Sequence, residues 1–170
     1  MQWKPGGVIE PSEPGVRCEN CHGPGSEHVQ AGGARDAIFS PKRLSASQLN
    51  EFCGACHRKP PAAGSDTDWT NPWNSRHQPL YLSQSPCFRK SNGRLSCLTC
   101  HNPHQPLERS ASVYDKRCAS CHAAPRHRTP VGTRSCMGCH MPQVPASAEL
   151  AFTNHWIGVY GKGRSLRPAR

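Results

Sequence analysis

The residues with the clearest chemistry are ten of the eleven cysteines, because they occur as five copies of one motif. In each copy two cysteines are separated by two residues, and a histidine directly follows the second cysteine. Positions i, i+3 and i+4 share one face of a helical turn, so both thiols can bond to one porphyrin while the histidine ligates its iron. The motifs therefore predict five covalently attached c-type haems. Numbered 1 to 5 along the chain, they are Cys18, Cys21 and His22; Cys53, Cys56 and His57; Cys97, Cys100 and His101; Cys118, Cys121 and His122; and Cys136, Cys139 and His140.

Other uses of paired cysteines fit this pattern less well. A zinc site would combine two cysteine pairs and would not need a histidine after each of them. A thioredoxin-like dithiol occurs once, beside a βαβ pattern that this sequence lacks. A disulfide framework would not repeat one fixed spacing followed by histidine. Haem attachment is therefore the interpretation that we carry forward.

Five further histidines match the number of motifs, and this match predicts a second axial ligand for each iron. The alternative for each one is a surface or hydrogen-bonded imidazole. Iron held between two imidazoles is low-spin, has no position free for substrate, and has a lower potential than iron with an axial methionine. We therefore expect a relay of electrons rather than catalysis. The candidate distal ligands are His28, His77, His104, His127 and His155.

The composition leaves little material for an ordinary hydrophobic core. Only 35% of the 170 residues are hydrophobic, 6% are aromatic, and 17 are proline and 15 glycine. We expect a mostly irregular fold with a few short α-helices and little or no β-sheet, organised around five covalently bound haems. Residues 1–170 are expected to form a single pentahaem domain, with a possible two-haem part at 1–60 and three-haem part at 77–160, joined by a loop at 61–76. Trp69, Trp73 and Trp156 are expected to pack against porphyrin faces.

Two local patterns predict helices that lead into motifs. Ser45 and Gln48 fit a capping box before a helix that runs into Cys53. Ser112, with Asp115 three residues later, is expected to cap a helix that enters motif 4.

Elsewhere the sequence predicts little regular structure. One short turn is expected at 27–31, where Gly32 and Gly33 would end it. No segment alternates apolar and polar residues convincingly enough for a strand. The basic tail after Tyr160 is expected to be flexible.

The charge balance does not indicate a nucleic-acid partner. Lys and Arg number 21 against 11 Asp and Glu, which gives a formal net charge of +10. Five haems would bring about ten propionate carboxylates, for which arginine is a suitable partner. No known nucleic-acid-binding motif or basic helix accompanies the charge, so we do not expect such binding.

The predicted haem chemistry places the protein outside the cytoplasm, in the periplasm or the extracellular space. Residues 1–17 show no charged and then apolar stretch typical of a secretory signal, so we expect a mature or truncated chain. No run of 18 apolar residues is present, so we expect no transmembrane segment.

Three segments of the chain resemble those of multihaem c-type cytochromes: Cys21 to His28, Cys100 to His104, and Cys139 to Pro142. The group includes the tetrahaem cytochrome of the hydroxylamine-oxidation pathway and its multihaem kin. In that group a histidine a few residues after a motif commonly ligates a neighbouring haem, which implies this role for His28 and His104. His127 and His155 are similar to the remaining distal positions less specifically. The resemblance covers most of residues 15–160.

Three functions are compatible with these features. The chain could be an electron carrier between redox proteins, or a subunit of an extracellular electron-conducting filament. In such a head-to-tail polymer, His28 or His155 could ligate a haem of the next copy. The third is a multihaem reductase with one open haem; the pentahaem nitrite reductases resemble it in haem number, but their catalytic haem typically carries a lysine ligand, whereas all five motifs here end in histidine.

Cys87 is the one cysteine outside the motifs. It is either a small buried hydrophobic residue or the site of an intermolecular disulfide.

Overall fold

The computed structural model describes the chain in two compact units, Met1–Arg43 and Leu44–Arg170. The residues described are 2–3, 9–10, 15–59, 66–123, 125–127, 130–132 and 134–169, with only the backbone of 2–3 and 9–10. Both units are mostly irregular chain with short helices, which confirms the expected fold class. The predicted division into two-haem and three-haem parts stays a prediction, and residues 61–65 of the expected loop lie outside the described residues.

The first unit holds motif 1 on a single helical turn. Its elements are the antiparallel pair β1 (Gln2–Trp3) and β2 (Ile9–Glu10), α1 (Cys18–His22), α2 (Ser26–Gln30) and the 3-10 turn η1 (Pro41–Arg43). After α2 the chain turns through Gly32 and Gly33, both with positive φ, and the Gly33 N–H donates to the His28 carbonyl at 2.8 Å. The short turn predicted around 27–31 is therefore confirmed.

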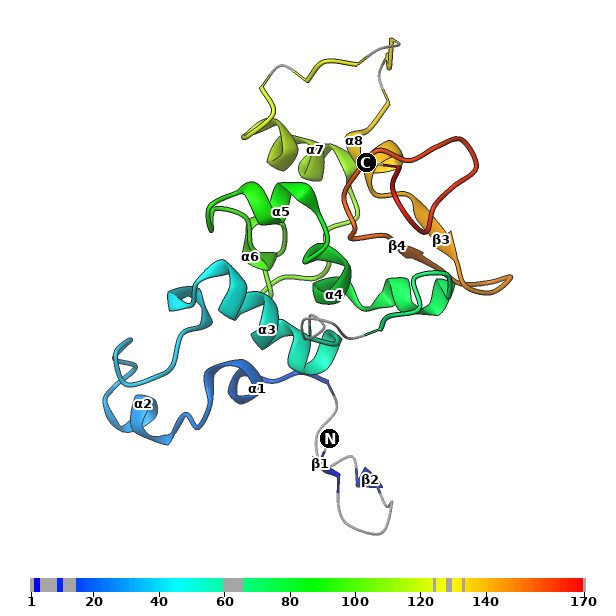
Figure 1. Cartoon of the computed structure of the whole chain (residues 1–170). Helices are drawn as coiled ribbons and strands as arrows, with labels where there is room; N and C mark the ends of the chain where they lie inside the picture. The colour runs from blue at the N-terminus through cyan, green and yellow to red at the C-terminus, as the bar shows by residue number, and fades with distance from the viewer. Residues whose placement is uncertain are drawn as a thin grey trace. The chain divides into compact units, whose positions relative to one another are not determined.

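The second unit carries motifs 2 to 5, each on a short helix or at the end of a longer one (Figure 1). Two of its helices exceed two turns, and each of these two leads into a motif. In chain order the elements are α3 (Ala46–His57), η2 (Pro72–Arg76), α4 (Gln78–Leu82), α5 (Pro86–Lys90), α6 (Cys97–Cys100), α7 (Ala111–Ala119), α8 (Cys136–His140), β3 (Gln143–Pro145) and β4 (Ala151–Thr153).

The helix into motif 2 begins as the sequence predicts. The Ser45 side chain accepts from the Gln48 N–H at 3.3 Å, and the Gln48 side chain accepts from the Ser45 N–H at 3.0 Å. This reciprocal pair satisfies two backbone donors that the first turn leaves open. The capping-box prediction is therefore confirmed.

The predicted cap of the helix into motif 4 is wrong, although the helix is present. The N-cap of α7 is Ser110, so Ser112 lies inside the first turn. Asp115 also lies inside the helix, and its carboxylate accepts from the Cys136 N–H at 3.0 Å instead of closing the helix N-terminus. Asp115, which local spacing predicts as part of a helix cap, instead binds the backbone N–H of Cys136 in motif 5.

A short hairpin follows motif 5 that the sequence analysis did not anticipate. Strands β3 and β4 pair antiparallel with Val144 opposite Phe152, and the Gln143 side chain donates to the Thr153 hydroxyl at 2.7 Å. With three residues per strand and Pro145 at one end, the segment is too short to show an alternating pattern. The hairpin returns the chain after motif 5 towards the motif.

The hydrophobic core is small and lies where α3 and α4 pack together. Leu49, Leu80 and Tyr81 are almost fully buried, as is Val144 of β3. Trp69 packs edge-on against Tyr81 and against Trp156, with ring centroids 5.2 and 5.0 Å apart. Packing of the tryptophans on porphyrin faces stays a prediction.

The tail after Tyr160 is folded back, which contradicts the expectation that it is flexible. The Asn154 side-chain amide donates to the carbonyls of Ser165 and Leu166 at 2.7 and 3.0 Å. The Ala169 N–H donates to the Val159 carbonyl at 2.7 Å. Across the described part of the chain, no helix has the length and apolar character needed to cross a membrane.

Candidate haem-binding site

Each motif forms the helical turn that haem attachment requires. Helices α1 and α8 coincide with motifs 1 and 5, and α3 ends at His57. In motifs 3 and 4 the histidine N–H donates to the carbonyl of the first cysteine, at 3.0 Å for His101 and 2.9 Å for His122. None of the eleven cysteines forms a disulfide, so both thiols of each motif are available for attachment. The two thiols and the imidazole of each motif therefore lie on one face of a helical turn.

The end of motif 2 depends on a tight reversal of the chain. Arg58 adopts a positive φ of 65°, a conformation that few side-chain-bearing residues take. The reversal lays Lys59 against buried Gly54, where a Cβ would lie 2.7 Å from the Lys59 Cα. Only glycine fits at this position between the two cysteines of the motif.

Four of the ten histidines have their ring fixed by a backbone carbonyl. Because a carbonyl only accepts, the Nδ1 of each ring carries the proton and the Nε2 lone pair is left for a metal. This is the usual outer contact of metal-binding histidines. The four bonds run from His22 to Phe39 at 2.7 Å, from His28 to Ala34 at 2.8 Å, from His140 to Gly158 at 2.8 Å, and from His155 to Thr153 at 3.0 Å.

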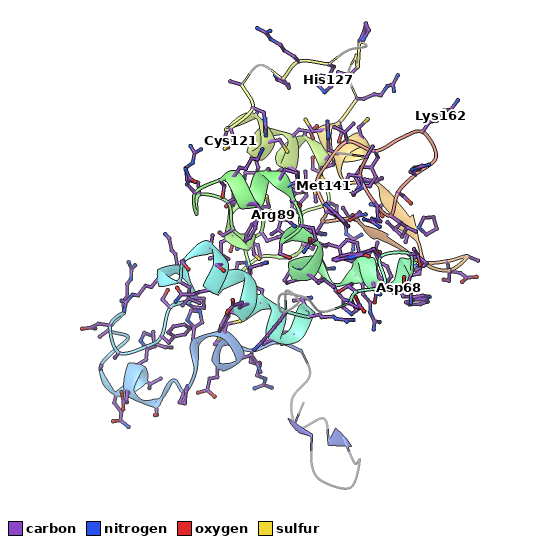
Figure 2. The ribbon with its side chains drawn as sticks, in the orientation of Figure 1. Asp68, Arg89, Cys121, His127, Met141 and Lys162 are labelled. Carbon is purple, nitrogen blue, oxygen red and sulfur yellow. The ribbon has the colours of Figure 1, made fainter. Side chains whose placement is uncertain are left out.

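Two of the expected distal histidines lie opposite a motif histidine. The ring centroids of His101 and His155 are 6.2 Å apart, and those of His127 and His140 are 6.1 Å apart. Figure 2 shows His127 on the segment between α7 and α8. A metal bound on both sides by imidazole nitrogens at about 2 Å separates the two ring centroids by roughly 6 Å. The centroid separation of both pairs therefore matches the spacing expected for an iron held between two imidazoles.

His155 is positioned by buried polar side chains from elsewhere in the second unit. The fully buried Ser85 hydroxyl donates to the His155 carbonyl and accepts from the Ile157 N–H, both at 2.8 Å. The fully buried Asn154 accepts from the Trp156 N–H at 2.8 Å, and its own N–H donates to the Pro142 carbonyl at 3.0 Å. The backbone on both sides of the ring is therefore fixed.

The imidazoles of the first pair are held in the form that binds a metal. Burial, together with the neighbouring His101 and His57, lowers the pKa of His155 to about 4. Burial and His57 also lower the pKa of His101. Both rings are therefore neutral at pH 7, as ligation requires.

His77 has a buried ring nitrogen that lacks a partner. It caps α4, and its Nδ1 forms no hydrogen bond within the described structure. Burial lowers the pKa of His77, and the positive charges of Arg58 and Arg76 lower it further. A buried polar atom without a partner indicates a group that this chain does not itself supply. For all five candidate distal histidines, His127 and His155 included, the role of axial ligand stays a prediction.

Thiols of successive motifs in the second unit lie close together. Cys53 and Cys97 are within hydrogen-bonding reach, and this contact lowers the pKa of Cys53 to about 7 and raises that of Cys97. Cys136 likewise contacts Cys118 of motif 4. Motifs 2 and 3 are thus neighbours in space, as are motifs 4 and 5.

Cys87 lies near thiols of motifs 3 and 4. Burial raises the pKa of the Cys87 thiol, and the charges of Cys100 and Cys121 raise it further. The partly buried position of Cys87 agrees with the first of the two alternatives, a small buried residue.

The donor set suits a haem better than a bare metal ion. Among the residues that the structure describes, no group of three or more His, Cys, Asp or Glu is arranged to hold an ion. Haem iron needs only two protein ligands because the porphyrin supplies the other four. In the first unit, an open cavity of about 380 Å³ lies beside His22 and is lined also by Phe39 and Arg43. The attachment turns, with this cavity at motif 1, therefore suit a c-type haem.

Sequence reasoning missed the buried polar residues that hold the backbone around the motifs and around His155. Ser85, Asn50 and Asn154 are polar and almost fully buried, yet nothing in their local sequence marks them. The partners of Ser85 and Asn50 lie 29 or more residues away along the chain, so local spacing carries no signal for these two residues. A serine or asparagine next to a predicted ligand, as Asn154 is to His155, is the one hint that the sequence offers.

Repeated attachment turns and paired imidazoles are features of multihaem c-type cytochromes, and comparison with known proteins supports that class. Over 111 residues, which make up 64% of this chain, the sequence is 28% identical to the multiheme cytochrome MtrA of Shewanella baltica (strain OS185). The match spans 27% of the length of that protein, so this chain corresponds to about a quarter of it. No family model and no solved structure matches the chain.

Proposed function

We propose that this chain is a five-haem c-type cytochrome that transfers electrons, with each iron held between two histidines. The observation that carries the proposal is the His101 and His155 pair, whose ring centroids are 6.2 Å apart. His101 belongs to motif 3, whereas His155 comes from beyond the β3–β4 hairpin. The buried Ser85 and Asn154 that hold the His155 backbone support a dedicated ligand rather than a chance neighbour.

Paired imidazoles suit the transfer of electrons better than the making of bonds. With both axial positions occupied, no site is open for a substrate, and the bound group supplies only a reversible one-electron change. The chain fixes the ligands with backbone hydrogen bonds at Nδ1 of His140 and His155, so oxidation and reduction need little rearrangement. The proposed role is therefore a relay and not an enzyme.

The contacts between motifs support passage of electrons along the chain. Cys53 lies against Cys97, and Cys118 against Cys136, so porphyrins attached at these thiols would be close neighbours. Close porphyrins favour rapid electron hopping. The spacing of motif starts, at 97, 118 and 136, also brings three attachment sites into a short length of chain.

The proposed function also implies a cellular compartment and a class of binding partner. Covalent haem attachment implies an exported protein that works in the periplasm or the extracellular space. Partners would be other redox proteins or further copies of the chain, joined head to tail in a conducting filament. His155 is paired within its own chain, which leaves His28 as the ligand better suited to a neighbouring copy. Electron microscopy of the native protein tests the polymer: filaments of regular rise support it, and dispersed particles refute it.

Spectroscopy of the haem-loaded chain tests the axial ligands. Electron paramagnetic resonance of the oxidised protein is expected to show low-spin iron throughout. Exchange of His155 for glycine should add one high-spin haem in five, and added imidazole should restore the low-spin signal. Tyr114→Phe is the matched control, because Tyr114 also packs on the His101 ring, at 5.9 Å, while its hydroxyl donates to the Glu108 carbonyl at 2.8 Å. Unchanged spectra in the His155→Gly variant would refute the assignment.

A further inference from the structure

Two polar side chains occupy the same place relative to two different motifs. Asn50 lies three residues before the first cysteine of motif 2, and Asp115 lies three residues before the first cysteine of motif 4. Each projects from the longer helix that leads into its motif, α3 or α7. Each also contacts the first cysteine of the following motif.

Asn50 connects three elements around motifs 2 and 3. It is only 1% exposed, and its amide N–H donates to the Pro79 carbonyl on α4 at 3.0 Å. Its side-chain oxygen lies 3.7 Å from the Cys97 sulfur, which haem attachment would convert from a thiol to a thioether, so this link to motif 3 is a packing contact. Since α6 begins at Cys97, Asn50 connects the helix of motif 2 to the start of motif 3.

Asp115 makes the corresponding connection between motifs 4 and 5. One carboxylate oxygen accepts from the Cys136 N–H at 3.0 Å and from the Ser135 hydroxyl at 3.4 Å. Cys136 is the first residue of α8, and Ser135 is its N-cap. Asp115 therefore connects the helix of motif 4 to the start of motif 5.

The surroundings of the two side chains repeat as well. Motif 2 ends α3 and motif 4 overlaps the end of α7, whereas motifs 3 and 5 each begin a short helix. In both pairs the helices pack together, α3 on α6 and α7 on α8. The first cysteines of each pair are also in contact, Cys53 with Cys97 and Cys118 with Cys136. The second unit thus contains the same two-motif arrangement twice.

We propose that Asn50 and Asp115 are positioning residues that fix the haem sites of motifs 2 and 3, and of motifs 4 and 5, as two equivalent pairs, and that their difference in charge separates the potentials of the two pairs. The proposal rests on the function proposed above. It names which side chains set the geometry and electrostatics within each pair.

The carboxylate of Asp115 is isolated in sequence from other acidic residues. Asp115 is the only acidic residue between Glu108 and Glu149, a stretch that contains six arginines and lysines. A carboxylate beside two attachment sites stabilises the oxidised, more positive haem and so lowers its potential. Neutral Asn50 makes the same connection without that effect. The haems at motifs 4 and 5 are therefore expected to have lower potentials than those at motifs 2 and 3.

Exchanging the two side chains tests the proposal in the haem-loaded protein. Asp115→Asn keeps an acceptor oxygen and removes the charge, so it should raise the potentials of two haems and leave the Soret circular dichroism unchanged. Asn50→Asp should lower the potentials of two other haems. Asp115→Ala removes the connection, so it should change both the potentials and the Soret circular dichroism, which reports the relative placement of neighbouring haems. Asp66→Asn, at an exposed carboxylate, is the control and should change neither.

Each result decides a separate point. Potentials that shift no more than in the Asp66→Asn control would overturn the electrostatic part. An unchanged Soret circular dichroism spectrum in Asp115→Ala would overturn the positioning part. Asp115 is only partly buried, so its variants test the proposal even where variants of the buried Asn50 fail to fold. The haem content and low-spin spectrum of the wild type report on the proposed function alone, so its failure would be recognised independently of these variants.

Discussion

Replacement of Ser85 by alanine is expected to loosen the segment that presents His155. The serine hydroxyl is fully buried and makes two hydrogen bonds of 2.8 Å, one to the His155 carbonyl and one from the Ile157 N–H. Alanine leaves both backbone groups buried without a partner. Each such group costs about 1–3 kcal/mol, so the free energy of unfolding should fall by about 2–6 kcal/mol. That is a large part of the roughly 5–15 kcal/mol typical of a whole domain.

Guanidinium unfolding of the haem-loaded chain measures this loss, provided that the slope with denaturant is unchanged. Ser120→Ala is the matched control, because Ser120 is exposed and its hydroxyl bonds only to the Arg117 carbonyl of its own helix. The control should lie within about 0.5 kcal/mol of the wild type. The Ser85 variant should also show a larger high-spin fraction from weakened His155 ligation. A Ser85→Ala variant as stable as the control would refute the positioning of His155 by this hydroxyl.

Three further substitutions test other parts of the account. Leu80 is 1% exposed in the small core, so Leu80→Ala should lower the free energy of unfolding by about 2–5 kcal/mol in denaturant titration. Ser45→Ala removes the capping box of α3 and should cost about 0.5–2 kcal/mol by the same measurement, whereas a loss no larger than that of Ser120→Ala would contradict the role of the cap. His127 is exposed and opposite His140, so His127→Gly should convert one haem to high-spin iron in paramagnetic resonance. An unaltered spectrum would remove His127 from the set of ligands.

Features that depend on neighbours in sequence were predictable from the sequence. The attachment turns follow from the i, i+3 and i+4 spacing of each motif, and the capping box follows from Ser45 and Gln48. The cap of α7 was misplaced because several polar residues near its start, Ser110 and Ser112 among them, suit such a position. The contact that decided the place of Asp115 comes from motif 5, beyond the reach of a local pattern.

The partners of the distal histidines were not predictable in this way. Matching the counts of motifs and spare histidines suggested that His155 was a ligand, but not that it faces His101. That pairing depends on the β3–β4 hairpin and on Ser85, whose contacts join residues far apart in the chain. The strands themselves were missed because three residues are too few to show a period of two.

The central claim is that covalently attached porphyrins, held by paired histidines, organise this chain. Intact-mass measurement of the protein matured with haem, combined with alkylation of free thiols after denaturation, tests it most directly. The account predicts an added mass of one haem for each of the five motifs and a single alkylated cysteine, Cys87. An unmodified mass, with free thiols at the paired cysteines, would contradict it.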